Sequence, residues 1–357
     1  MKPRTVAILA LAALLTTVAA GLALNNQRPA LATVERGEKL FPDLASKAAE
    51  ISSVVLENGG RTLTFERQGE DWTLKESDGY AVEAAKLRGL IIGLGELELR
   101  QAKTKRRDRL VVLDLDDPSA SSDAKRLRLL DAQGGAIAGL VIGKTKYGSS
   151  EAGRGIYLRR DGEDQAWLAQ GEITADSAPD GWLKKGIFDV DSDRVARVSV
   201  SHPDGETVLV GKDKPEQKNA SLLNLPKGEE PREKSTADAY LRPFHEFELR
   251  DARKAANKAL AGDKTISVEM TTFDGLTVKL AFVVEDDKVW ATVAAAGEKK
   301  ESTESTETTE TKDHDPVKEA AEINTRSRGW VFQIPDWKVT SLKQRLADVI
   351  KKKDDKK

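Results

Sequence analysis

The stretch LFPDL at residues 40–44 returns in altered form as IFDV at 187–190 and as IPDW at 334–337. The aspartate of the second phrase lies 146 positions after that of the first, and the aspartate of the third lies 147 positions after that of the second. Self-similarity at a fixed period is typical of a duplicated structural unit. The phrases therefore predict two similar modules in tandem, with a phrase at the start, at the junction and at the end.

Two longer alignments keep the same order and spacing. NGGRTLTF at 58–65 parallels PDGETVLV at 203–210, and LGELELRQA at 94–102 parallels FHEFELRDA at 244–252. Chance recurrence of a hydrophobic residue followed by aspartate explains one phrase but not this agreement, so the repeat is the preferred interpretation. We expect the residues at these seams to be structural: Phe41, Asp43, Trp182, Asp189, Trp330 and Asp336.

Each predicted module combines antiparallel strands with a covering helix. Asn58-Gly59-Gly60 lies between two alternating segments and is a hairpin signal. After Val82, apolar residues recur at intervals of three and four, which is typical of an amphipathic helix. The corresponding helix of the second copy, at 237–252, contains Pro243, which should shorten or kink it. The predicted fold class is α+β: an N-terminal transmembrane helix, then two tandem similar modules of antiparallel strands with covering helices.

Short helix signals accompany the three phrases. The phrase aspartates are candidate N-caps, because their side-chain oxygens can accept the free backbone N–H groups of a first turn. Nearby serines offer the same chemistry, at Ser46, Ser192 and Ser341. After the third phrase, Leu342, Leu346, Val349 and Ile350 predict a closing amphipathic helix.

The predicted organisation has five segments and two loose insertions. The insertions are polar and highly charged, and the second of them cannot bury enough apolar area to offset chain entropy. The segments are a membrane anchor or signal at 1–24, a linker at 25–39, a first module at 40–186, a second module at 187–350 with insertions at 211–237 and 297–315, and a charged tail at 351–357.

The N-terminus indicates where the protein resides. Residues 6–24 run for 19 positions without a charge, which is long enough for a helix to span the hydrocarbon of a bilayer. Lys2 and Arg4 precede this run and favour an N-terminus on the cytoplasmic side. We expect a single-pass anchor in a bacterial inner membrane with the bulk of the chain in the periplasm. The alternative is a signal peptide cleaved near Ala30-Leu31-Ala32.

Composition excludes several functional classes. The chain contains 57 basic and 59 acidic residues, a balance that argues against a dedicated nucleic-acid binder. It contains no cysteine, which excludes disulfides, thiolate metal sites and a cysteine nucleophile. No phosphate-binding glycine loop or dinucleotide fingerprint is present, so no cofactor is predicted.

No residue is predicted to be catalytic or to bind a metal. The only histidines are His202, His245 and His314, which lie in separate predicted elements. DVDSD at 189–193 begins like a calcium loop, but loop positions six and twelve hold Arg194 and Val200 instead of glycine and glutamate. A helix cap at the junction is the better interpretation of these aspartates.

Two basic runs occupy matching places in the two copies, at 103–109 and 250–258. A solvated charged edge that discourages strand pairing is the preferred interpretation of these runs. The alternative is contact with an acidic partner surface or with anionic lipid headgroups. The candidate contact residues are Lys103, Lys105, Arg106, Arg107, Arg250, Arg253 and Lys254.

The chain resembles the bacterial domain of unknown function 4340 family. The resemblance rests on the N-terminal anchor, on the segment that begins LFPDLASKAAEISSVV, on the helix VEAAKLRGLIIGLGEL and on GWLKKGIFDVDSDRVARVSV. It implies a membrane-tethered extracytoplasmic protein associated with gliding-motility-type ABC transport systems, and it implies no catalytic residue.

These observations predict a non-enzymatic periplasmic accessory or scaffold protein whose partners are ABC transporter subunits or other envelope proteins. A glycan- or lipid-binding module and a carboxylate-dependent hydrolase are the alternatives. Buried tryptophans would favour a protein partner, an aromatic groove would favour glycan, and clustered carboxyls with raised pKa values would favour the enzyme.

Overall fold

The computed structural model describes residues 37–148, 155–299 and 314–352. The predicted anchor, most of the predicted linker and most of the predicted insertion at 297–315 lie outside the described residues. Within the described part of the chain, no helix is both long and apolar enough to cross a membrane.

The chain forms two compact units. The described residues of the first unit lie within Met1–Arg67 and Ala85–Ser177, and those of the second lie within Gln68–Ala84 and Ala178–Lys357. The sequence repeat placed residues 68–84 inside the first module. The structure instead assigns them to the second unit, because their side chains pack there, as described below.

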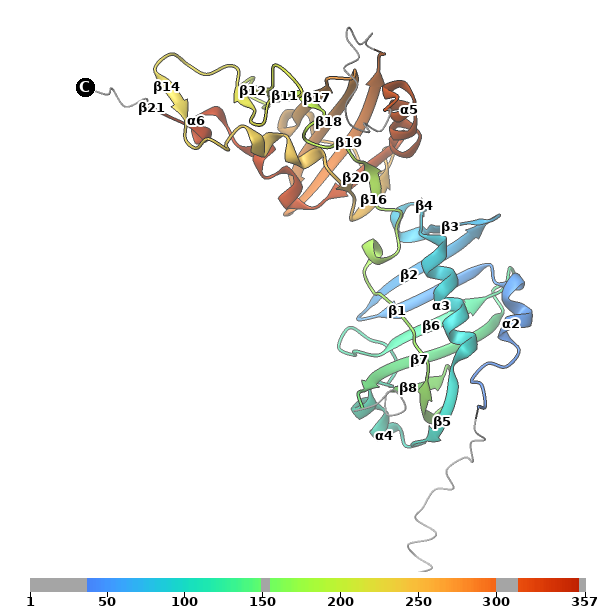
Figure 1. The fold of residues 1–357 in the computed structure, drawn as a ribbon. Coiled ribbons are helices and arrows are strands. Elements are labelled where there is room, and N and C mark those ends of the chain that lie inside the picture. Colours follow the sequence, from blue (N-terminus) through green and yellow to red (C-terminus); the bar gives the residue numbers. More distant parts are fainter. Residues whose placement is uncertain (1–36, 149–154, 300–313, 353–357) are drawn as a thin grey trace, which may run out of the picture. The chain divides into compact units, whose positions relative to one another are not determined.

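The first unit is an antiparallel sheet covered by helix α3 (Ala84–Glu96). The strands that belong to this unit have the order β2-β1-β6-β7-β8-β9-β5. Figure 1 shows α3 running across the strands of this sheet. The strands are β1 (Ser53–Asn58), β2 (Arg61–Gln68), β5 (Glu98–Ala102), β6 (Lys125–Leu130), β7 (Ala136–Lys146), β8 (Gly155–Arg160) and β9 (Ala166–Gln170), and the short helices are α2 (Leu44–Lys47), η1 (Ala48–Glu50), α4 (Arg107–Leu110) and η3 (Val111–Leu113).

The predicted hairpin and helix of the first unit are confirmed. The turn between β1 and β2 places Gly59 and Gly60 at positive φ, a backbone conformation that glycine adopts without steric cost. Helix α3 buries Leu87, Leu90 and Leu94, which recur at helical spacing. The sheet and helix thus form where the hydrophobic pattern indicated.

The segment α4–η3 packs closely against the sheet. Leu110 and Leu115 form a buried cluster with Val141 of β7. A Cβ built on Gly143 of β7 would lie 2.1 Å from the carbonyl oxygen of Leu113. Glycine at 143 therefore permits this approach.

Gly143→Ala should lower the free energy of unfolding by about 1–3 kcal/mol, because the added methyl group overpacks the contact. Gly89→Ala in α3 is the matched control, since a Cβ there meets no atom within 4 Å. The control should raise stability by about 0.5–1 kcal/mol, because alanine favours helix. Urea unfolding followed by circular dichroism measures both, and equal stability of the two variants would contradict the close approach.

The second unit contains a larger antiparallel sheet with the order β13-β12-β11-β17-β18-β19-β20-β16. Two-stranded pairs form separately between β10 and β15 and between β14 and β21. The strands are β10 (Gly186–Phe188), β11 (Val195–Ser201), β12 (Thr207–Gly211), β13 (Ser221–Leu222), β14 (Glu229–Pro231), β15 (Phe247–Glu248), β16 (Asp251–Lys254), β17 (Ile266–Thr272), β18 (Leu276–Glu285), β19 (Lys288–Gly297), β20 (Trp330–Ile334) and β21 (Ile350–Lys352). The helices are η5 (Pro179–Gly181), η6 (Asp238–Tyr240), η7 (Arg242–Phe244), η8 (Gly262–Lys264), α5 (Pro316–Ser327), η9 (Asp336–Val339), η10 (Ser341–Lys343) and α6 (Leu346–Val349).

Helix α5 covers the part of β19 that β20 leaves unpaired. Strand β20 pairs with residues 289–291 of β19. Beyond them, the Asn324 side chain accepts from the Ala295 N–H at 2.9 Å and donates to the Ala295 carbonyl at 2.7 Å. Asn324 therefore takes the place of a neighbouring strand and protects this edge.

Asn324→Ala should lower the free energy of unfolding by about 1–3 kcal/mol, because it leaves two half-buried backbone groups without a partner. Thr325→Ala is the matched control, since Thr325 is exposed and bonds only within α5. Chemical denaturation measures both, and the prediction fails if the two variants lose the same stability.

Residues 68–84 add the short hairpin β3 (Asp71–Leu74) and β4 (Tyr80–Ala81), joined through η2 (Lys75–Ser77), to the second unit. The Ser77 hydroxyl donates to Asp251 at 2.6 Å, and Asp78 accepts from the backbone N–H of Lys254 and the side chain of Asn257 at 2.9 Å. These contacts hold the hairpin beside β16.

Two helix predictions for the second unit are wrong. Residues 237–252 form the turns η6 and η7 and then β15, because Pro243 cannot donate an intrahelical hydrogen bond. The closing helix is limited to the single turn α6, and Ile350 begins β21. The segment 211–237, expected to be loose, contains β13 and β14 and buries Leu222.

The capping prediction for the phrase aspartates is also wrong. Asp43 lies at the N-cap of α2 but makes no side-chain capping bond. Asp189 bonds to a distant turn, and Asp336 is the first residue of η9 and pairs with Lys343 at 2.7 Å. Of the other seam residues, Trp182 is buried, whereas Phe41 and Trp330 are half-buried.

Candidate functional site

The second unit contains a groove of about 880 Å³. It forms where the β3–β4 hairpin meets β10, β15, α5 and β20. The side chains that line it come from Gln68, Asp71, Thr73, Tyr80, Ala81, Glu83, Lys184, Phe188, Asp189, Glu246, Glu248, Thr325, Arg326 and Trp330.

The aromatic residues of the groove belong largely to the core. The Tyr80 ring meets Trp330 edge to face, with ring centroids 4.9 Å apart, and it meets Phe332 at 5.9 Å. Burial raises the pKa of Tyr80 to about 12, so its phenol is neutral at physiological pH. Phe188 stacks on Phe247 at 4.6 Å. Tyr80 and Phe188 are buried and Trp330 is half-buried, so the groove offers little aromatic surface on which a ligand could stack.

The charges of the groove are mainly negative. Arg326 donates to the carbonyl of Ile187 at 3.1 Å and pairs with Glu322 at 3.3 Å, so part of its charge is already engaged. A groove with this excess of carboxylates favours a cationic ligand or a basic partner segment. The acidic residues are Asp71, Glu83, Asp189, Glu246 and Glu248, against Lys184 and Arg326.

Asp189 organises one side of the groove. Its carboxylate accepts from the backbone N–H of Glu246 at 2.7 Å and lies 2.9 Å from Nδ1 of His245. Glu246 has a φ of 44°, a left-handed conformation that costs free energy in a residue with a Cβ. Asp189 thus holds a strained turn in place. Sequence analysis missed His245 as its partner, because 56 residues separate the two and nothing in the local pattern connects them.

Asp189, Asp191 and His245 could also hold a metal ion. One ligand atom from each lies within 4.8 Å of the others, and two carboxylates with an imidazole suit divalent transition metals. All three side chains are exposed, and Asp189 is already engaged by two donors. This geometry fits an orienting hydrogen-bond set better than a built metal centre.

The carboxyl of Asp189 should titrate below its ordinary value of 3.8. The hydrogen bond from Glu246 is the largest cause of the lowered pKa, and His245 adds to it against the effect of burial. Because the folded pKa is depressed, the stabilisation is present at neutral pH and is lost as pH falls through that pKa.

The backbone amide signal of Glu246, followed by NMR from pH 6 to pH 2, should shift with a midpoint below 3.8. Asp189→Asn should remove this transition while keeping an oxygen acceptor. A midpoint at or above 3.8 would show that the bond does not favour the carboxylate.

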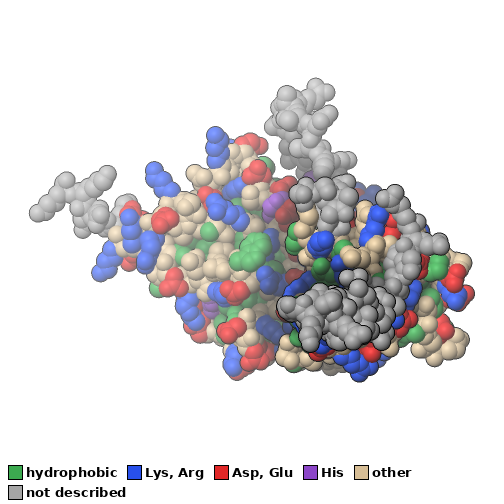
Figure 2. Space-filling view, turned by 90° about the horizontal axis from the view of Figure 1, so that it is seen from below, with side chains coloured by type: hydrophobic (Ala, Val, Ile, Leu, Met, Phe, Trp, Pro, Cys, Tyr) green, Lys and Arg blue, Asp and Glu red, His purple; other side chains and the backbone are tan. Residues whose placement is uncertain are grey.

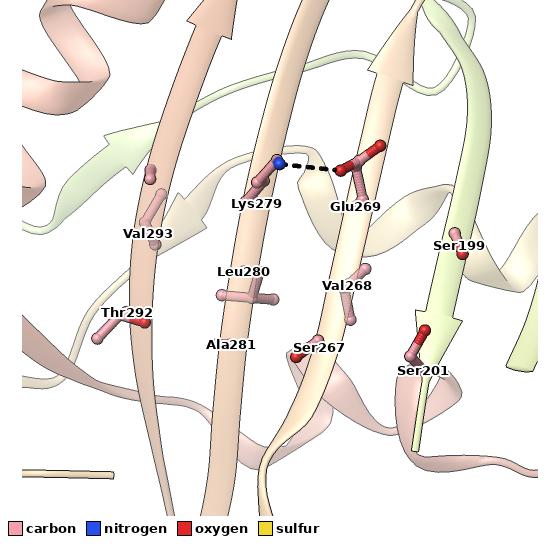
Figure 3. Close-up of a pocket in the computed structure, with 11 residues that line it drawn as sticks. Ser199, Ser201, Ser267, Val268, Glu269, Lys279, Leu280, Ala281, Thr292 and Val293 are labelled. Atoms are coloured by element: carbon pink, nitrogen blue, oxygen red, sulfur yellow. Dashed lines mark ion pairs between the residues drawn. The ribbon is translucent and has the colours of Figure 1, made fainter. Parts of the chain in front are cut away.

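A second hollow of about 500 Å³ lies on the open face of the sheet. Figure 3 shows its side chains on four adjacent strands, with Lys279 paired to Glu269 at 3.3 Å. Ser199, Ser201 and Ser267 are short, so this polar face is shallow. It suits contact with another broad surface better than enclosure of a reacting molecule.

Two of the four predicted basic contacts of the first unit are neutralised by carboxylates. Arg106 pairs with Asp108 at 2.8 Å, and Arg107 pairs with Asp164 at 3.0 Å. Lys103 donates to Gln101 at 2.6 Å, whereas Lys105 is exposed. Figure 2 shows basic and acidic side chains interspersed in the same way over the visible surface.

The predicted basic contacts of the second unit differ among themselves. Arg253 pairs with Asp251 at 2.8 Å. Arg250 and Lys254 are exposed and form no ion pair within the described residues. The basic run at 103–109 lies in the first unit, and the run at 250–258 lies in the second. Arg250 of the second run lines a hollow beside Trp337.

The tryptophans are mainly structural. Trp167, Trp182 and Trp290 are buried. Trp72 and Trp330 are half-buried, whereas the Trp337 side chain is 65% exposed. Trp337 is therefore the tryptophan best placed to meet a ligand.

One comparison with known proteins returned a match. The family model described as Domain of unknown function (DUF4340) matches residues 72–265. The comparison with curated proteins and the comparison with solved structures each found no match.

Proposed function

Because the chain belongs to the domain of unknown function 4340 family, we propose that it is a non-enzymatic accessory protein of an ABC-type envelope transport complex. In this proposal the N-terminal segment tethers the protein to a bacterial inner membrane. The two units lie in the periplasm and dock onto transporter subunits or other envelope proteins.

The acidic groove is the observation that carries the docking proposal. It is open, it is lined by more carboxylates than cations, and its aromatic rings are mostly committed to the core. Such a surface recognises a basic segment by charge complementarity, which fixes orientation and speeds encounter. The burial of Trp167, Trp182 and Trp290 agrees with a protein partner.

A hydrolase that uses paired carboxyls needs one of them to remain protonated, with a raised pKa. Among the described residues, each aspartate whose pKa departs clearly from its ordinary value is lowered, as for Asp189 and Asp274. Burial acts to raise the pKa of Asp274, but hydrogen bonds from Thr272 and Arg194 outweigh it.

We also propose that the two units are copies of one ancestral module. The order β2-β1-β6-β7-β8-β9-β5 of the first unit has the same sequence of connections as β12-β11-β17-β18-β19-β20-β16 of the second. All neighbouring pairs in both series are antiparallel. Duplication explains this agreement together with the sequence period.

Site-specific photocrosslinking in native membranes tests the docking proposal. A photoreactive amino acid at Glu248 in the groove should capture transporter subunits, identified by mass spectrometry. The matched control carries the same probe at Glu216, an exposed glutamate outside the groove lining. The control should capture transporter subunits at least about tenfold less, which corresponds to about 1.4 kcal/mol of contact free energy.

A charge reversal extends this test. Each variant carries the photoreactive amino acid at position 248. Lys184→Glu makes the groove more acidic and should leave the capture of transporter subunits unchanged or increase it. Glu246→Lys makes the groove less acidic and should reduce this capture, because the partner segment is expected to be basic. Capture of wall polymer alone, or equal capture from both probe positions, would overturn the proposal.

A further inference from the structure

Trp337 is the most exposed large hydrophobic residue in the described part of the second unit. It lies in η9, between the buried residues Pro335 and Lys338. Lys338 donates from Nζ to the carbonyl of His245, and Asp336 pairs with Lys343. The backbone that carries the indole is therefore fixed while the ring itself meets solvent.

Two hollows of about 410 and 400 Å³ lie beside Trp337, which lines both of them. Lys338 lines the second hollow and places its ammonium 4.7 Å from the centroid of the indole. Lys338 does not line the first hollow. In the first hollow, Trp337 is therefore available to a ligand without competition from the Lys338 ammonium. Its volume falls within the range of about 300–1,000 Å³ that ligand sites occupy.

The polar side chains of the first hollow include two cations. Arg250 and Lys288 are exposed and form no ion pair in the described ranges. Of the two acidic residues there, Asp336 is paired with Lys343, which leaves Asp287. The backbone N–H of Arg250 donates to the carbonyl of Gln333 at 2.8 Å, which fixes the arginine beside β20. The hollow thus combines an exposed aromatic side chain with two unpaired cations and only one unpaired carboxylate.

We propose that the hollow beside Trp337 binds a sugar unit that carries a carboxylate or a phosphate. The C–H face of a pyranose ring is apolar and packs on the indole, while Gln333 and Thr340 can bond its hydroxyls. Arg250 and Lys288 receive the anionic group through charge-assisted hydrogen bonds. This ligand uses both features of the site.

Other anionic ligands fit less well. An acidic protein segment would gain most from an apolar pocket for an anchoring side chain, yet Val289, Ile334 and Pro335 of this hollow are buried. A bilayer surface would need a protruding apolar patch, whereas Trp337 borders concave surface. This site is distinct from the acidic groove and does not depend on the docking proposal.

Isothermal titration of the full chain in detergent with hexagalacturonate tests the site, with neutral maltohexaose as the comparison ligand. Hexagalacturonate should bind at least about tenfold more tightly, which corresponds to about 1.4 kcal/mol. Trp337→Ala and Arg250→Glu should each weaken this binding by at least about tenfold. Arg197→Glu is the matched control for charge, since Arg197 is exposed on β11 and lines neither hollow, and it should retain the parent affinity.

Three results would overturn the proposal. They are the absence of saturable binding, equal affinity for the acidic and neutral sugars, and unchanged affinity in a folded Trp337→Ala variant. Hexaglutamate provides the remaining comparison: binding as tight as that of hexagalacturonate would show that charge alone is recognised, and this also contradicts a sugar site. Circular dichroism spectra confirm that each variant is folded.

Discussion

The second unit depends on the packing of Tyr80 against Trp330 and Phe332. Tyr80 comes from a short hairpin early in the chain, and its two partners come from a strand about 250 residues later. Ser77 and Asp78 add hydrogen bonds to the same region. The acidic groove has its shape because this hairpin provides one side and β10, β15, α5 and β20 provide the rest. A site of this kind cannot be assigned to one continuous segment.

The sequence predicted local structure well where one physical signal was sufficient. Gly59-Gly60 specified a hairpin, and the spacing of Leu87, Leu90 and Leu94 specified α3. It failed at 237–252, where similarity to the first copy suggested a helix although Pro243 opposes one. The repeat period also placed residues 68–84 in the first module, whereas they belong to the second unit. Their partners are determined by tertiary packing, which the local sequence pattern does not reveal.

The candidate sites were less predictable than the fold. The bond between Asp189 and His245 depends on a turn that forms only in the folded second unit. Arg250 was predicted as a contact residue, whereas Trp337, which lines the same hollow, was not among the predicted contacts. The structure distinguishes Trp337 by exposure, which composition and spacing do not report. The second unit thus carries an acidic groove and, separately, a hollow beside Trp337 with two unpaired cations, and the two suit ligands of opposite charge.

A double-mutant cycle on Tyr80 and Trp330 in the full chain tests the central claim most directly. Tyr80→Leu, Trp330→Leu and the double variant would be compared by urea unfolding. The account predicts that the two residues are coupled by about 0.5–1.5 kcal/mol, as for an edge-to-face aromatic pair. Additive effects within about 0.3 kcal/mol would contradict it, because they would show that the hairpin does not pack into the second unit.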